Sequence, residues 1–437
     1  MEGFTVYSTE RAAPVPFFPD DIIQQILLKL PTKSLLRFKC VCKSWRDLIS
    51  THEFAIKHLT ETSERFRRFG VFESEKLREG RISLYSLAAQ TSSRAEEAEE
   101  ETICLPLRGK DCYLAPAANE YIINRFIYTR VLGSCNGILL IRLENVEESS
   151  GHPRTFLLWN PTIREFKMIP PCYFKSSLCS LVSGLGYNSS IDNYKVVVVF
   201  SERNSDLAYG YVYNLKTNSW KRLENFYFPY KNTRQVNNFG NLFLSDETCL
   251  GYLPEETGYL LEETGTTIVN GAPHWVTLSS SRGGVNKIIY FDLEEEKFKE
   301  FLSPPPSAGT FKTYLSIYED CLCETRLRRE KGFFEYMFEV WIMKEYGVKE
   351  SWIKLLNLPF DLRFSLMSDI RPLFVSKNGD EVVMVTDWSD MISFNTRTGE
   401  VKKVSMRVDR GHVVGSYKES LVSPNQFSMS CSEDGKY

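Results

Sequence analysis

The chain has 437 residues, a formal net charge of -3 at pH 7, and 43% hydrophobic and 13% aromatic residues. This length and apolar content are enough to bury a substantial core and suggest more than one domain. The nearly balanced charge argues against a nucleic-acid-binding protein. The longest aliphatic block, Val196 to Phe200, is far shorter than the roughly 20 residues of a membrane helix, so no membrane contact is expected.

Residues 1–16 are predicted to form a disordered leader. They carry acids early and no hydrophobic region after a basic start, so they do not predict a signal peptide. We therefore expect a protein of the cytoplasm or nucleus whose eleven cysteines are reduced thiols. Cys40 with Cys42, and Cys321 with Cys323, are single-spaced pairs with no second pair at zinc-ligand distance, so no metal site is expected.

An amphipathic helix is predicted directly after the leader, and two shorter helices follow it. Asp20 and Asp21 suit the free N–H groups of the first turn, and Pro31 ends the first helix. Thr32 is a suitable N-cap for the second helix. The three helices together place apolar residues at helical spacing: Ile22, Ile23, Ile26, Leu27, Leu30, Leu35, Leu36, Phe38, Val41, Trp45, Leu48 and Ile49. A core this small, in about 40 residues, usually depends on a partner, a metal or disulfides.

Residues Pro19 to Trp45, PDDIIQQILLKLPTKSLLRFKCVCKSW, resemble the F-box pattern LPxxLxxxIxxxLPxKSLLRFxCVxKxW. Phe18 stands where the family usually has Leu. The resemblance implies an F-box at residues 17–62, a linker at 63–69, and binding to the Skp-type adaptor that joins cullin and RING subunits in a ubiquitin ligase. The implied contact residues are Phe18, Pro19, Ile22, Ile26, Leu30, Pro31, Leu35, Val41 and Trp45. The alternative is that these residues form only a private three-helix core.

Six basic residues crowd the same stretch: Lys29, Lys33, Arg37, Lys39, Lys43 and Arg46. They alternate with core positions and lack the aromatic platforms or base-reading spacing of a nucleic-acid module. We expect them to form a solvated helix face.

From Gly70 onward the apolar residues come in short β-branched and aromatic runs, which is typical of many antiparallel strands. A repeat consists of an aromatic residue, then Asn or Asp, then a large apolar residue six positions later. Its copies are Trp159-Asn160 with Phe166, Tyr213-Asn214 with Trp220, Phe291-Asp292 with Phe298, and Phe394-Asn395 with Val401. Trp341 with Trp352 fits as a fifth copy if its turn carries four extra residues. Each copy predicts two strands joined by a turn that the Asx side chain closes.

Hairpin-like pairs precede these copies, beginning at Ser134, Leu185, Ile268, Thr313 and Leu373, the last with an Asn378-Gly379 turn. Five four-stranded blades follow from this count, and strand-like ends at residues 69–87 and 411–422 would form a sixth. The expected fold is therefore a small all-α F-box of three short helices followed by an all-β propeller. Six blades closed by strands from both ends of the domain are favoured.

The motifs GSCNGIL from Gly133 and WNPTIREF from Trp159 resemble the F-box-associated domain found behind plant-type F-boxes, often called F-box/kelch-repeat. The resemblance implies that this propeller domain covers residues 70–425, with a tail at 426–437. Kelch blades carry a Gly-Gly pair in each repeat, whereas Gly283-Gly284, in a loop, is the single candidate here. The kelch name is therefore doubtful.

Patterns that would support catalysis are weak. Gly184-Leu185-Gly186 lacks the third glycine of a dinucleotide loop, and the sequence contains no phosphate-loop, HExxH or GxSxG motif. His274 lies within a predicted strand pair and is interpreted as a packed core residue rather than a general base. The sequence thus predicts a protein that is not an enzyme and needs no cofactor.

Together these expectations favour a substrate-recognition subunit of an SCF-type E3 ubiquitin ligase, which promotes ubiquitination and proteasomal degradation of an unidentified target protein. The alternatives are an F-box scaffold or a carbohydrate-binding propeller without a degradative role. An enzyme in the propeller channel comes third.

One loop is a candidate for binding the target. Residues Asn225 to Lys231, NFYFPYK, concentrate aromatic side chains in an otherwise polar connection. Its candidate contact residues are Phe226, Tyr227, Phe228 and Tyr230. The equal alternative is that these rings fold down to cover a blade edge.

Overall fold

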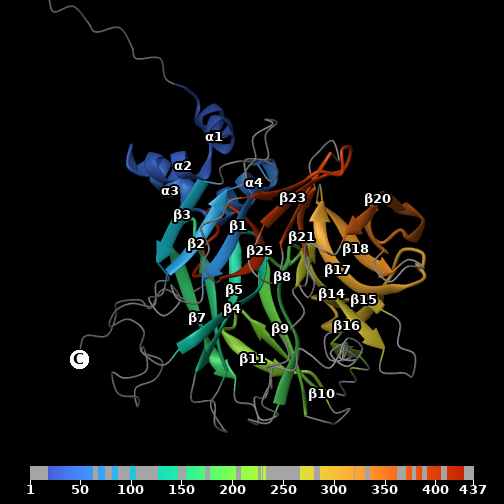
Figure 1. The fold of residues 1–437 in the computed structure, drawn as a ribbon. Helices are drawn as coiled ribbons and strands as arrows, with labels where there is room; N and C mark the ends of the chain where they lie inside the picture. Colours follow the sequence, from blue (N-terminus) through green and yellow to red (C-terminus); the bar gives the residue numbers. More distant parts are fainter. Residues whose placement is uncertain are drawn as a thin grey trace, which may run out of the picture.

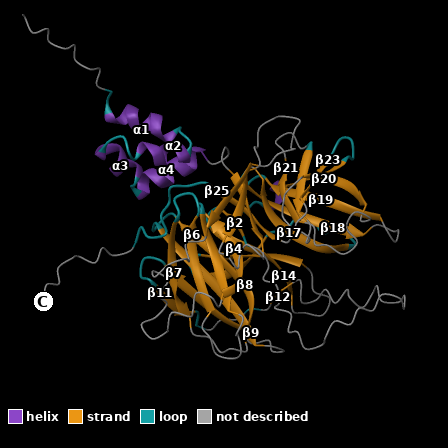
Figure 2. Ribbon diagram, turned by 60° about the vertical axis from the view of Figure 1, so that its left-hand side comes forward, coloured by secondary structure: helices purple, strands orange, loops and turns teal. Residues whose placement is uncertain are grey.

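The structure, a computed structural model, describes residues 18–62, 67–73, 81–86, 99–104, 126–145, 154–172, 178–202, 208–224, 228, 230–232, 266–279, 286–318, 320–329, 335–361, 371–375, 380–385, 391–404 and 411–427. Helices come first in the chain and antiparallel sheets follow (Figure 1). Figure 2 shows the helices gathered on one side of the part that is rich in strands.

The helical module has four helices, where three were expected. They are α1 (Asp20–Leu28), α2 (Thr32–Phe38), α3 (Lys43–Ile49) and α4 (His52–Thr62). Thr51 caps α4, because its hydroxyl accepts a hydrogen bond from the N–H of Phe54 at 3.2 Å. Phe54, Ala55 and Leu59 then form a buried face of this fourth helix. The first strand begins at Arg67, so residues 67–69 of the expected linker belong to a sheet.

The helix starts differ from the prediction at Thr32. Pro31, not Thr32, is the N-cap of α2, and no side chain caps that helix. Thr32 is buried, and its hydroxyl has no hydrogen-bond partner within the described part of the chain. The prediction that Thr32 caps the second helix was therefore wrong. Cys42 caps α3 instead, accepting from the N–H of Trp45 at 3.5 Å.

The described strands form six antiparallel sheets. The first joins β25 (Gly411–Lys418), β1 (Arg67–Glu73), β2 (Arg81–Ser86) and β3 (Glu99–Cys104) in that order. The second is β4 (Phe126–Cys135), β5 (Ile138–Asn145), β6 (Arg154–Asn160) and β7 (Glu165–Cys172). The third is β11 (Ser219–Arg222), β10 (Ala208–Asn214), β9 (Asn193–Glu202) and β8 (Leu178–Asn188).

The fourth sheet is β12 (Tyr230–Asn232), β14 (Ala272–Ser279), β15 (Asn286–Asp292) and β16 (Lys297–Phe301), with β13 (Thr267–Val269) also paired to β14. The fifth is β17 (Thr310–Tyr318), β18 (Cys321–Arg329), β19 (Glu335–Met343) and β20 (Trp352–Asp361). The sixth is β21 (Arg371–Val375), β22 (Glu381–Val385), β23 (Met391–Asn395) and β24 (Val401–Val404). Strand β4 lies beside β8, β8 beside β14, β14 beside β17 and β17 beside β21, while β25 lies beside β4. Sheets that follow one another along the chain therefore meet through β4, β8, β14, β17 and β21, and β25 brings the first sheet against the second.

The four main copies of the aromatic–Asx repeat pair as predicted. Trp159 lies opposite Phe166, Tyr213 opposite Trp220, Phe291 opposite Phe298, and Phe394 opposite Val401. The pairing predicted for the fifth copy, Trp341 with Trp352, was wrong. Trp341 lies opposite Lys354, and Met343 lies opposite Trp352. The turn of this copy is longer and contains a short 3-10 helix, Lys349–Ser351, so Met343 and Trp352 form the pair next to the turn. A register shift follows only beyond Trp341, at Val340/Trp341.

The Asx side chains close these turns. Asn160 accepts from the N–H of Thr162 at 2.9 Å, and Asp292 accepts from Glu294 and Glu295, both at 3.0 Å. The fourth residue after each Asx has a positive φ: Arg164 at 61°, Asn218 at 52°, Glu296 at 53° and Gly399 at 72°. The turns share one geometry as well as one sequence pattern. Asn378-Gly379 lies outside the described residues.

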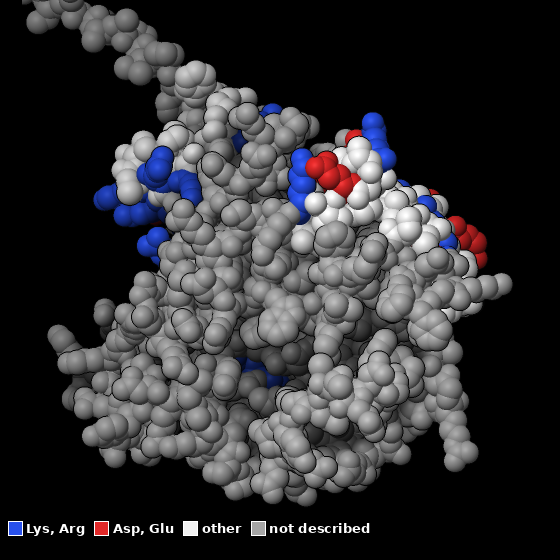
Figure 3. Space-filling view, viewed as in Figure 1, with Lys and Arg blue, Asp and Glu red and all other residues white. Residues whose placement is uncertain are grey.

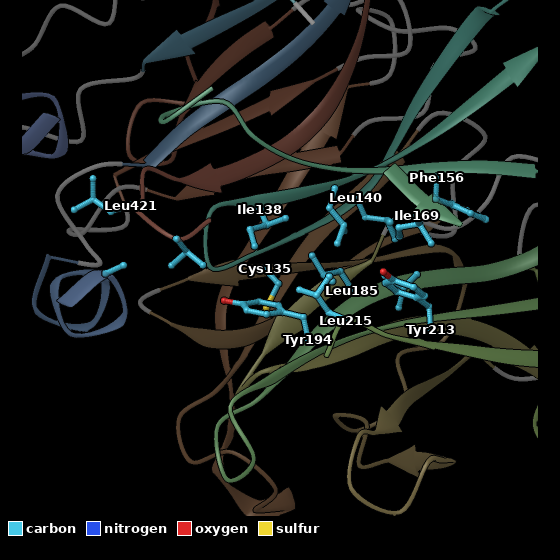
Figure 4. Close-up of a cluster of buried hydrophobic side chains, with 14 of the residues drawn as sticks. Cys135, Ile138, Leu140, Phe156, Ile169, Leu185, Tyr194, Tyr213, Leu215 and Leu421 are labelled. Atoms are coloured by element: carbon cyan, nitrogen blue, oxygen red, sulfur yellow. The ribbon is translucent and has the colours of Figure 1, made fainter. Parts of the chain in front are cut away.

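The largest buried cluster runs from the sheets into the helical module. Figure 4 shows Cys135, Ile138 and Leu140 facing Leu185 and Tyr194 between the second and third sheets, and Leu421 farther to the left, toward the helices drawn in blue. Leu421 follows β25, and the same cluster contains Leu27, Leu28, Leu35, Ile49, Phe54 and Ala55 of the helices. The helical module and the sheets therefore share a core.

Candidate partner-binding surface of the helical module

Four large apolar side chains of the helical module are exposed to solvent: Phe18 by 60%, Ile22 by 38%, Ile26 by 53% and Val41 by 61%. Ile22 and Ile26 are four residues apart on α1 and therefore share one face. Phe18 precedes that helix, and Val41 lies between α2 and α3. Exposed large apolar side chains grouped on a small module are typical of an interaction site.

The opposite face of α1 holds the helix in place. Leu27 and Leu28 are buried, and Ile23 and Leu30 pack against the same core. His58 of α4 donates from Nε2 to the carbonyl oxygen of Leu30 at 2.8 Å, which ties the end of α1 to α4. Burial lowers the pKa of His58, so its ring favours the neutral form.

The predicted adaptor-contact residues do not all lie at the surface. Pro19 and Pro31 are exposed along with the four apolar side chains above, and Leu30 and Trp45 are half-buried. Leu35 is completely buried, because it points into the core that α2 shares with the other helices. It supports the surface from beneath and does not reach solvent. Phe38 packs against Trp45 with ring centroids 5.5 Å apart.

The same helical module also carries exposed basic side chains. Lys29, Lys33, Arg37, Lys43 and Arg46 are exposed, and Figure 3 shows blue side chains gathered over the helical module. Lys39 is half-buried, and this burial lowers its pKa although the nearby Glu165 raises it. The basic face is solvated, as the sequence predicts, except at Lys39.

The aromatic loop is only partly within the described residues. Phe228 is 5% exposed and packs edge-on against Phe298, with ring centroids 5.0 Å apart. Strand β12 begins at Tyr230 and pairs with β14, which draws this part of the loop onto the fourth sheet. Phe228 thus belongs to the buried cluster that the third and fourth sheets share. Phe226, Tyr227 and the side chain of Tyr230 lie outside the described residues.

A second group of exposed apolar side chains lies where the fourth and fifth sheets meet: Leu302, Tyr346, Val348 and Ile353. Trp352 donates from its indole nitrogen to the carbonyl oxygen of Leu302 at 2.8 Å, which joins the two sheets here. The rings of Phe301 and Tyr346 are 5.0 Å apart. Sequence reasoning missed this group because its residues come from an irregular turn and a strand end.

His274 is buried at the same junction. Its Nδ1 donates to the carbonyl oxygen of Ala272 at 2.9 Å, so its Nε2 accepts from the hydroxyl of Tyr346, also at 2.9 Å. Burial lowers the pKa of His274 to about 4. The residue is a neutral, fully bonded core histidine, as predicted.

Within the described ranges, no three His, Cys, Asp or Glu side chains are grouped as they would be around a metal ion. The helices of the described part are all too short or too polar to cross a membrane.

Comparison with known protein families matches two parts of the chain. The F-box domain model matches residues 17–57, and the F-box associated beta propeller domain model matches residues 115–261 and 252–424. Together these ranges cover more than half of the chain.

Relatives from Arabidopsis thaliana are similar over most of their length. An F-box/kelch-repeat protein is 27% identical, over 93% of this chain and 96% of its own. The F-box protein CPR1 is 26% identical, over 89% of this chain and 83% of its own. Among solved structures, the Dos1 propeller has 9% identity and a TM-score of 0.33, covering 77% of this chain and 71% of that one. The two family matches and the full-length relatives show that the chain belongs to the plant F-box proteins with a C-terminal F-box associated domain.

Proposed function

We propose that the protein is the substrate-recognition subunit of an SCF-type E3 ubiquitin ligase. The F-box binds a Skp-type adaptor, which brings the cullin and RING subunits, and the propeller holds a target protein. The exposure of Phe18, Ile22, Ile26 and Val41 is the observation that carries this proposal, since these side chains offer apolar contacts to a partner on the module that the F-box family model matches.

In this function the protein performs no chemistry of its own. Holding a target beside the ligase raises the effective concentration of the target for ubiquitin transfer, and degradation by the proteasome follows. Neither a cofactor nor a catalytic residue is required, and the cytoplasm or nucleus is the proposed location. The alternative function is that of an F-box scaffold without a degradative role. Isolation of the protein together with its adaptor and cullin distinguishes the two, because only the ligase function predicts ubiquitylated target in that complex.

The proposed architecture is a six-bladed propeller closed by strands from both ends of the domain. Six sheets that follow one another in chain order support it, as does the antiparallel pairing of β1 with β25, in which Phe69 lies opposite Ser416.

Replacing Ile22 and Ile26 together by Asp is expected to weaken adaptor binding by about 100-fold or more, because two central apolar contacts become buried charges. Titration calorimetry with the purified Skp-type adaptor measures the affinity. Both side chains are at least 38% exposed, so the melting temperature should change little. Ile353→Asp, at a side chain 45% exposed on β20, is the matched control and should bind the adaptor normally. Undiminished binding by the double variant would refute the proposed surface.

The target site is proposed to include the aromatic loop. Because Phe228 is buried, a useful variant changes Phe226, Tyr227 and Tyr230 to Ser and keeps Phe228. We expect at least a tenfold or so loss of target capture, with adaptor binding and melting temperature preserved. The candidate targets are proteins that accumulate when the chain is removed from cells. A stable variant that still captures them would move the target site elsewhere, and Val348→Asp, at a side chain 40% exposed, would then test the second exposed apolar group.

A further inference from the structure

After strand β25 the chain stays packed against the sheets and the helices. Residues Glu419–Phe427, here named the C-terminal strap, run between the turns of the second and third sheets and the helical module. Glu419, Ser420, Leu421 and Val422 are all buried, with exposed fractions of 7%, 0%, 6% and 0%. Two polar residues in a fully buried stretch require specific partners.

The second sheet and its turns form hydrogen bonds with Ser420, Val422 and Asn425 of the strap. The side-chain amide of Asn160, in the β6–β7 turn, lies 3.1 Å from the carbonyl oxygen of Ser420 and 2.8 Å from that of Val422, and donates to both. The hydroxyl of Ser420 donates to the carbonyl oxygen of Asn136, in the β4–β5 turn, at 2.6 Å. Asn425 donates to the carbonyl oxygen of Phe166 at 3.2 Å. The strap is thereby fixed to the second sheet.

On its other side the strap packs against the helices. Leu421 and Val422 lie in the same buried cluster as Ile49, Phe54 and Ala55. The strap thus supplies apolar side chains to the core of a module that is small for its number of helices.

The end of the strap meets the start of α4. The rings of Phe427 and His52 meet edge-on, with their centroids 6.0 Å apart. The ammonium of Lys216 lies over the Phe427 ring, 5.0 Å from its centroid. His52 also donates to the carboxylate of Asp192, in the β8–β9 turn, at 2.7 Å. Asp192 in turn accepts from the hydroxyl of Tyr187 at 2.8 Å. The third sheet, the strap and α4 therefore form one connected contact.

We infer that the C-terminal strap completes the core of the F-box and fixes its orientation on the propeller. The F-box is then ordered before any adaptor arrives, and its own C-terminal segment takes the place of the partner that so small a module needs. The inference concerns the free protein and does not depend on what the F-box binds.

The turn residue Asn160 offers a sharp test, because its two side-chain atoms have separate tasks. Its oxygen accepts from Thr162 within the turn, and its nitrogen donates to the strap. Asp292 occupies the equivalent position of another turn, so Asp is compatible with the turn itself. Asn160→Asp keeps the acceptor, removes the donor, and places a carboxylate against two carbonyl oxygens.

The experiment is hydrogen exchange of the full chain without adaptor, followed by mass spectrometry. Asn160→Asp should lower the protection of amides in α1 to α4 by about tenfold or more and leave the fifth sheet unchanged. Asn395→Asp is the matched control: its oxygen also accepts turn N–H groups, from Arg397 and Thr398, and its nitrogen does not hold the strap. It should exchange like the unaltered protein.

Truncation supplies a second, independent variant. A chain ending at Lys418 lacks the strap and should lose protection in the helices, whereas a chain ending at Phe427 should keep it. The inference is overturned if the helices stay protected in both the Asn160→Asp variant and the shorter chain. It is equally overturned if the helices are unprotected in the unaltered chain, or if Asn160→Asp exposes the fifth sheet as much as the helices.

Discussion

Replacement of Glu339 by Gln is expected to lower the free energy of unfolding by about 3 kcal/mol at pH 7, since it leaves cations without their buried partner. Glu339 lies on β19 and is 1% exposed. Its carboxylate accepts from Arg328 at 2.8 Å, Lys354 at 3.0 Å, Trp341 at 3.2 Å and Ser307 at 2.8 Å. The amide of Gln has the same shape, so the loss reports on charge rather than on packing. Chemical denaturation of both proteins measures it.

The loss should depend on pH. Burial opposes ionisation of Glu339, but hydrogen bonds from Ser307, Lys354 and Trp341 outweigh it and lower the pKa to about 2, from its usual 4.5. Because the folded pKa lies below the unfolded one, the carboxylate contributes its full stabilisation above about pH 4.5 and loses it as the pH falls toward 2. The difference between the two proteins should therefore shrink across that window.

Glu400→Gln is the control for the Glu339 experiment. Glu400 lies 3.8 Å from Lys402, and both side chains are more than half exposed. An exposed pair of this kind contributes about 0–1 kcal/mol, so its variant should be nearly as stable as the unaltered protein. Equal losses in the two variants, or a Glu339 effect that is the same at pH 7 and pH 3, would contradict the buried-network interpretation.

Gly137→Ala is expected to cost about 3 kcal/mol or more, because backbone strain and a steric clash add together. Gly137 follows Asn136 in the β4–β5 turn and has a φ of 82°. A Cβ there would lie 2.7 Å from the carbonyl oxygen of Lys418 and would overlap the hydroxyl of Ser420. Backbone atoms cannot move aside as the end of a long side chain can. Thermal or chemical denaturation measures the loss.

Gly347→Ala separates the two contributions. Gly347 has the same φ of 82°, but no atom lies within 4 Å of the position that its Cβ would take. Its variant should lose only the conformational term, about 1 kcal/mol. If Gly137→Ala cost no more than Gly347→Ala, the close approach between this turn and the C-terminal strap would be wrong.

Local patterns predicted most of the strands, because both halves of each predicted pair carry their own turn signal. The aromatic–Asx repeat identified four strand pairs with the correct register, since an Asx side chain closes the turn and fixes which residues face each other. The prediction failed at Trp341, where the turn extends from Lys344 to Ser351 and no Asx closes it. The length of this turn pairs Met343 with Trp352, and Trp341 therefore lies opposite Lys354.

The fourth helix and the position of Leu35 show what periodicity cannot distinguish. A stripe at helical spacing marks a helix, but α1 carries apolar residues on two faces, and only packing against α4 decides that Leu27 is buried and Ile26 exposed. Leu35 matched the family pattern and proved to be core.

Buried charges are equally invisible to sequence reasoning. Glu324 and Arg326 are spaced two apart on β18, as surface residues of a strand are, yet both are buried. Nε of Arg326 lies 2.6 Å from a carboxylate oxygen of Glu324. Burial raises the pKa of Glu324, while Arg326 opposes that shift. Arg326 has a further partner in another segment, the carbonyl oxygen of Pro304, which accepts from its guanidinium at 3.2 Å. Such long-range pairing is decided by tertiary structure alone.

The pairing of β1 with β25 has a consequence for how the protein is made. Strand β25 is synthesised roughly 340 residues after β1, which corresponds to about 20–70 s at ordinary rates of translation. Until then one edge of β1 has no partner strand, and the core of the helices lacks the side chains of the strap that follows β25. The nascent chain therefore exposes a strand edge and the apolar faces of its first domain throughout synthesis. Chaperones that bind such surfaces on the ribosome should engage this protein until β25 and the strap have emerged.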